Sequence, residues 1–111
     1  MRKTIEQMLS MMLQRDLQLT SNNKNVKQGR LINFACNDYV ITLTLKNAKK
    51  QLKSYDVYYP YNVTQESGTV VFDYTVDTLT AGQSGLIDVI MKHGKEIKNH
   101  KLFDSRLVFK Y

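Results

Sequence analysis

The chain has 111 residues, and its 16 lysine and arginine residues outnumber 10 aspartate and glutamate residues, giving a formal net charge of +6 at pH 7. This length predicts a single domain, residues 1–111, that buries a core without disulfide bonds. The one cysteine, Cys36, excludes an internal disulfide bond, and no apolar run reaches the about 18 residues of a membrane-spanning helix. The opening residues also lack the features of a signal peptide, so we expect a cytoplasmic protein with no membrane partner.

An amphipathic helix is predicted from Ile5 to Leu17. Thr4 and Gln7 have the spacing of a capping box, and apolar residues then recur at intervals of three and four. Met11 broadens the apolar face, which either fills gaps in the core or meets a partner. The polar segment from Thr20 to Gly29 is predicted to be a loop.

Apolar character resumes in a predicted strand from Arg30 to Cys36. The parity of the apolar positions then changes between Phe34 and Ile41. A turn at Asn37-Asp38 or a bulge within one strand would each produce this change. We favour the turn, because asparagine and aspartate tolerate turn geometry.

A hairpin from Tyr39 to Tyr59 is the centre of the predicted fold. Apolar and polar residues alternate on both sides of a lysine-rich turn at 47–50, and Pro60 ends the second strand or places it at an edge. The alternative is a short helix from Lys46 to Ser54, since this segment contains good helix formers.

The remainder of the chain is predicted to hold a connection at 61–68, a strand at 69–76, a helix and a last strand. The helix runs from Thr80 to His93, with capping-box spacing at its start and Gly94 at its end. The strand from Arg106 to Tyr111 is expected at a sheet edge, where its basic residues discourage unwanted pairing.

These elements predict an α+β fold, with an antiparallel sheet of four to five strands and two helices in the order α-β-β(-β)-β-α-β. The αβββα portion resembles a double-stranded-RNA-binding domain in element order. The segment AGQSGLIDVI stands where that family has a glycine- and lysine-rich opening of its second helix, so the resemblance implies nothing about individual residues.

Catalytic patterns are sparse. His93 and His100 do not have a zinc-ligand spacing, and the chain has no phosphate-binding glycine loop. Asp73 and Asp77 could bind a cation, but such acids more often solvate a surface. We therefore predict a non-enzyme with no catalytic residue, metal or cofactor.

Charge is distributed in blocks along the chain. Residues 24–53 contain seven basic residues and one acid, residues 54–91 contain no lysine or arginine, and the residues from 92 onward are basic again. A clustered potential of one sign attracts an anionic partner, and tyrosines beside lysines suit single-stranded nucleic acid. The predicted nucleic-acid or partner-binding residues are Lys24, Lys27, Arg30, Lys46, Lys49, Lys50, Lys53, Tyr55, Tyr58, Lys92, Lys95, Lys98 and Lys101.

Three functions follow as hypotheses. The first is a small basic protein that binds nucleic acid, or a nucleic-acid-handling protein, through the lysine-rich hairpin. The second is a protein-binding regulator or inhibitor directed against a host system, since the small size and a composition typical of AT-rich genomes suit a phage or mobile element. The third is an interaction module that forms a homodimer.

Overall fold

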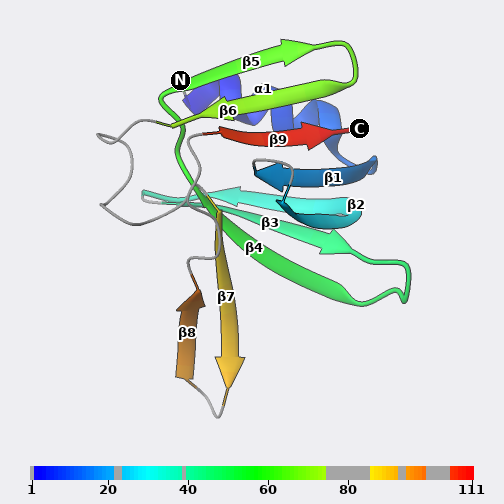
Figure 1. Ribbon diagram of the computed structural model, residues 1–111, viewed down its shortest axis with the longest axis vertical. Coiled ribbons are helices and arrows are strands. Elements are labelled where there is room, and N and C mark those ends of the chain that lie inside the picture. Colours follow the sequence, from blue (N-terminus) through cyan, green and yellow to red (C-terminus); the bar gives the residue numbers. More distant parts are fainter. Residues whose placement is uncertain (1, 22–23, 39, 75–85, 93–94, 100–105) are drawn as a thin grey trace.

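The computed structural model describes residues 2–21, 24–38, 40–74, 86–92, 95–99 and 106–111 (Figure 1). Within these residues the chain forms one helix, α1 (Arg2–Met12), and a nine-stranded sheet in the order β5-β6-β9-β1-β2-β3-β4-β7-β8. Every neighbouring pair of strands is antiparallel. The strands are β1 (Asp16–Ser21), β2 (Lys24–Cys36), β3 (Val40–Lys46), β4 (Leu52–Tyr58), β5 (Asn62–Glu66), β6 (Thr69–Asp73), β7 (Leu86–Lys92), β8 (Lys95–Asn99) and β9 (Arg106–Lys110).

The core lies between α1 and one face of the sheet. Ile5, Leu9 and Met12 of the helix are fully buried, and alternate residues of the strands pack with them. Met8 and Met11 pack against the same cluster, so the methionines of α1 belong to the core. The other buried apolar residues are Leu17, Leu19, Leu31, Ile41, Leu43, Leu45, Val57, Val70, Phe72, Tyr74, Leu107 and Phe109.

The hairpin from Tyr39 to Tyr59 is confirmed, because β3 and β4 pair along their whole length, from Val40 with Tyr58 to Lys46 with Leu52. The alternative helix from Lys46 to Ser54 is therefore wrong. The predicted turn at Asn37-Asp38 is also confirmed, because β2 ends before it and β3 begins after it. Val40 N donates a hydrogen bond to Asn37 Oδ1 over 2.8 Å.

The α+β prediction with two helices and four to five strands is wrong, because a sheet of nine strands with one helix makes up the described residues. The predicted helix from Thr80 to His93 fails where it is described, since 86–92 form β7. Isoleucine and valine are β-branched and favour strands, and β7 covers the edge of β4 by pairing with Tyr55–Val57. The rest of that predicted helix lies outside the described residues. The element order shared with double-stranded-RNA-binding domains requires this second helix, so that resemblance is also wrong.

Four other features differ from the sequence-based expectation. The helix ends at Met12, and Leu17 belongs to β1. Both predicted connections contain strands: Thr20–Gly29 includes the end of β1 and the first half of β2, and 61–68 includes β5. The strand Arg106–Lys110 is no edge strand, because β9 lies between β6 and β1 (Figure 1).

Strand β2 is shared between two parts of the sheet. Residues from Lys24 to Arg30 pair with β1, whereas residues from Arg30 to Cys36 pair with β3. The two pairings meet beside Gly29. A Cβ atom on Gly29 would lie 2.9 Å from Leu45 Cβ and 2.9 Å from the Lys46 carbonyl oxygen, so only glycine permits this close approach.

Candidate functional site

The turn between β3 and β4 is built around Asn47. Its Oδ1 accepts hydrogen bonds from the backbone N–H groups of Lys49 and Gln51, each over 3.0 Å, and its Nδ2 donates to Gln51 Oε1 over 3.2 Å. Lys50 N also donates to the Asn47 carbonyl oxygen over 2.9 Å. These contacts fix the tip, so that its lysines project from an ordered loop.

Lys50 has a left-handed backbone conformation, with φ of 63°. A β-carbon is unfavourable there, and glycine or asparagine usually occupies this position of a hairpin loop. The turn therefore keeps a positive charge at a position where the backbone alone favours glycine.

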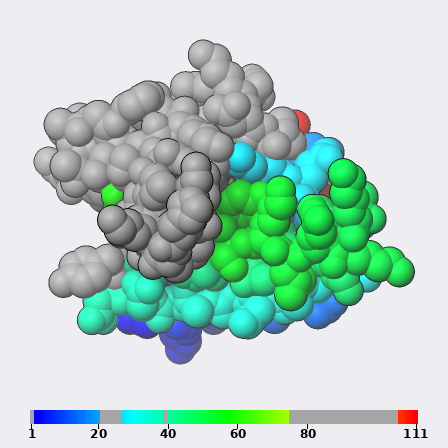
Figure 2. All heavy atoms as spheres, turned by 90° about the horizontal axis from the view of Figure 1, so that it is seen from below, coloured from blue at the N-terminus to red at the C-terminus, as the bar shows by residue number. Residues whose placement is uncertain are grey.

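A groove lies beside this turn. It encloses about 1120 Å³ and is lined by the start of β1, the middle of β2, the end of β3, the turn at 47–51, the start of β4, and the residues Lys110 and Tyr111. Figure 1 shows that the start of β1, the end of β9 and the hairpin tip lie at the same side of the molecule, to the right of the view. Figure 2 shows the hairpin, in green, projecting at that side beside the cyan atoms of β2.

The charge of the groove is predominantly positive. Among its described lining residues there is one acidic side chain, that of Asp16. The carboxylate lies 3.6 Å from Arg30 Nε, in a pair whose side chains are 82% and 54% exposed respectively, so solvent weakens the attraction. The cationic lining residues are Arg30, Lys46, Lys49, Lys50, Lys53 and Lys110.

Strand register explains how cations that are distant in the sequence meet. Arg30 pairs with Lys46 across β2 and β3, and both share a face of the sheet because opposed residues of antiparallel strands do so. Lys110 pairs with Gln18, which in turn pairs with Gln28, and these three residues form a row across β9, β1 and β2. The uncharged amides of Gln18 and Gln28 thus line the basic groove in the same row as Lys110.

The five predicted residues Arg30, Lys46, Lys49, Lys50 and Lys53 all line the groove. The structure brings together this part of the predicted surface.

The tyrosines predicted as stacking platforms do not line it. Tyr55 and Tyr58 are half-buried and pack against the core cluster, and Lys27 Nζ lies 5.6 Å from the centroid of the Tyr55 ring. Burial raises the pKa of the Tyr58 phenol. Both tyrosines therefore stabilise the sheet by packing against the core.

The remaining predicted lysines are not among the described lining residues of the groove. Lys24 lies in β2, where it pairs with Ser21, and Lys92, Lys95 and Lys98 lie in β7 and β8. Lys101 lies outside the described residues.

Several groove residues were not predicted from the sequence. Lys110 belongs to the second basic block but was not among the predicted binding residues, and only the placement of β9 beside β1 brings it here. Gln18, Gln28 and Gln51 carried no signal, since single amides in polar segments are common. Asp16, Asn47 and Tyr111 also line the groove and were not predicted.

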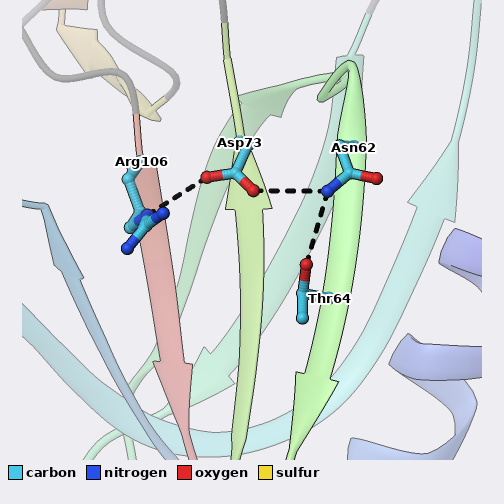
Figure 3. A network of polar contacts seen from close by, with 4 residues as sticks. All are labelled: Asn62, Thr64, Asp73 and Arg106. Carbon is cyan, nitrogen blue, oxygen red and sulfur yellow. Dashed lines mark hydrogen bonds and ion pairs between the residues drawn. The ribbon is translucent and has the colours of Figure 1, made fainter.

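The candidate cation site at Asp73 and Asp77 has a different role where it is described. Asp73 Oδ1 accepts a hydrogen bond from Arg106 Nε over 3.1 Å, and Asp73 Oδ2 accepts one from Asn62 Nδ2 over 3.4 Å (Figure 3). The same Asn62 amide donates to Thr64 Oγ1 over 3.3 Å. Asp73 therefore links β5, β6 and β9, while Asp77, His93 and His100 lie outside the described residues.

The surroundings of Cys36 disfavour its thiolate form. Burial raises the pKa of its thiol, and the nearby Glu6 carboxylate raises it further, against smaller opposing effects of Tyr59 and Arg2. A raised thiol pKa disfavours the thiolate, which is the nucleophilic form. In the described part of the chain, no group of three or more histidine, cysteine or acidic residues could hold a metal ion.

No helix in the described residues has both the length and the apolar character needed to cross a membrane. Comparisons with protein-family models, curated proteins and solved structures give no significant match to the chain.

Proposed function

We propose that this protein is a non-enzymatic, cytoplasmic nucleic-acid-binding protein whose binding site is the basic groove. The observation that carries the proposal is the gathering of six cationic side chains from β2, β3, the 47–51 turn, β4 and β9 around one hollow. Like charges repel, and the phosphates of a nucleic acid neutralise that repulsion. Binding also releases the counterions of the phosphates to solution, which favours the complex.

The dimensions of the groove favour a polymer over a small anion. Its volume of about 1120 Å³ lies at the upper end of small-molecule sites, which span roughly 300–1,000 Å³, and the hollow is open to solvent. The cations are distributed along several elements of this open groove. This arrangement is suited to successive phosphates of one chain.

The test is oligonucleotide binding by fluorescence anisotropy between about 50 and 300 mM NaCl. If all six cations contact phosphates, the slope of log K against log salt should approach about −4 for a single strand. Replacing Lys46, Lys49, Lys50 and Lys53 by alanine should reduce affinity by at least about tenfold. The slope should also become shallower by about 0.7 for each phosphate that no longer meets a lysine.

A matched pair of single variants controls for net charge. Lys53→Ala removes an exposed cation from the groove, and Lys3→Ala removes an exposed cation from α1, outside it. Only Lys53→Ala should weaken binding appreciably. Equal losses in both variants, or affinity that does not depend on salt, would refute the groove as a nucleic-acid site.

The second basic block is tested separately. Replacing Lys92, Lys95, Lys98 and Lys101 by alanine removes the same charge as the hairpin variant. A comparable loss of affinity would extend the binding surface to this block, whereas unchanged affinity would restrict the surface to the groove.

A further inference from the structure

The amides of Gln18 and Gln28 are unusual components of a phosphate-binding groove. The two residues oppose each other on β1 and β2, both are exposed, and both line the hollow. Within the described part of the chain neither amide has a hydrogen-bond partner in the protein. Gln51, also in the lining, uses its oxygen to accept from Asn47, which leaves its NH2 group available.

A phosphate can bind only the donor group of each of these amides. A phosphate accepts hydrogen bonds, so it can bind the NH2 group of a glutamine but cannot bind its carbonyl oxygen. Nucleic-acid bases present donors and acceptors side by side, and glutamine matches such an edge in a bidentate manner. An amide pair surrounded by lysines is therefore complementary to a base whose flanking phosphates contact the lysines.

The concave shape determines which form of nucleic acid can present that base. In a duplex the base edges lie at the floor of a groove that is roughly 12 Å wide and 8.5 Å deep, so they are read by an element that protrudes into it. Residues that line a hollow cannot reach them. Unstacked bases of a single strand can instead turn into the hollow.

We propose that the groove binds single-stranded nucleic acid, with the hairpin lysines on its phosphates and a base in hydrogen-bond contact with the amides of Gln18 and Gln28. This inference rests on the proposed function of the groove and defines its ligand class. Substituting these two glutamines tests base recognition separately from charge, because every cation of the groove stays in place.

The experiment compares the wild-type protein with the double variant Gln18→Ala/Gln28→Ala. The probes are single-stranded homopolymer oligonucleotides, a hairpin duplex with the same number of phosphates, and inorganic polyphosphate of matched length. The wild type should bind at least one homopolymer more tightly than the duplex. The double variant should lose about three- to tenfold in affinity for that homopolymer, the effect of one to two neutral hydrogen bonds.

Two readouts separate base contact from damage to the fold. Affinity for polyphosphate and the salt slope should be unchanged in the double variant, since no charge is altered. Gln7→Ala, an exposed glutamine of α1 outside the groove, serves as the control and should bind like the wild type.

Several results would overturn the inference. The first is a duplex that binds as tightly as every single strand, which would indicate the hairpin acting as a ribbon in a major groove. The others are an undiminished affinity of the double variant, or an equal loss with polyphosphate. In each case salt-dependent binding would remain. The proposed function itself fails if no nucleic acid binds in a salt-dependent manner, or if Lys53→Ala and Lys3→Ala lose affinity equally.

Discussion

The side chain of Tyr74, the residue that follows β6, links this strand to the hairpin through a hydrogen bond. It is 3% exposed, and its hydroxyl donates to the Tyr58 carbonyl oxygen over 2.7 Å. Burial raises the pKa of this phenol well above its usual value of 10.0. The unfolded chain therefore loses this proton at a lower pH than the folded protein, and the stability that the neutral phenol supplies is lost as pH rises above about 10.

We predict that Tyr74→Phe lowers the free energy of unfolding by about 1 kcal/mol at pH 7, because the hydrogen bond is lost and the Tyr58 carbonyl is left without this donor. The deficit should shrink as pH rises above about 10, since phenylalanine has no proton to lose. Urea denaturation across this pH range measures both effects. Tyr61→Phe changes a side chain that is 54% exposed and should follow the wild type; a deficit for Tyr74→Phe that is independent of pH would contradict the assignment.

The β3–β4 hairpin is the element in which stability and the proposed binding are opposed. Lys50 occupies a left-handed conformation and lines the groove. Relieving that conformation should stabilise the turn, while losing the ammonium group should weaken the attraction of anions.

We predict that Lys50→Gly raises the free energy of unfolding by about 1 kcal/mol, because a β-carbon is unfavourable at this φ. The same variant should bind oligonucleotides more weakly than the wild type. Thermal or chemical denaturation and anisotropy on one preparation test both statements. Lys49→Gly, at a neighbouring position without a positive φ, should weaken binding without stabilising the fold; stabilisation by both variants would exclude the backbone explanation.

The hairpin was predictable because its apolar residues alternate with polar ones over both strands, whereas neighbouring elements lack that pattern. The first half of β2 places Lys27 and Gly29 opposite Leu19 and Leu17, so it carries no apolar period and was predicted to be a loop. Segment 86–92 has apolar residues at intervals that also fit a helix. Its pairing with β4 is a long-range contact that local sequence does not reveal.

At the scale of the whole molecule, the groove combines charges that the sequence shows with neighbours that only the topology supplies. The lysines of residues 46–53 were recognisable as a local cluster. Arg30 and Lys110 join them through strand register and through the position of β9. The amides of Gln18 and Gln28 had no sequence signal, because their role depends on facing each other across two strands.

We predict that Asp16→Asn increases oligonucleotide affinity by about two- to fivefold, the effect expected from an exposed ion pair worth at most about 1 kcal/mol. The substitution removes the one acidic side chain among the described lining residues and frees Arg30 for a phosphate. The melting temperature should change little because both partners are largely exposed. Anisotropy at low salt measures the effect.

The control is Glu66→Gln, which makes the same change in net charge at an exposed position of β5, outside the groove. Its affinity should stay close to that of the wild type. An equal gain in both variants would mean that binding responds to total charge rather than to the groove.

The position of β9 also sets the order in which the molecule can be completed. β9 is the last strand of the described chain, yet it lies between β6 and β1 and pairs with both. Until β9 emerges from the ribosome, β1 and β6 each present an unpaired strand edge that can pair with another chain. The two parts of the sheet on either side of β9 can therefore be joined only after β9 has been synthesised.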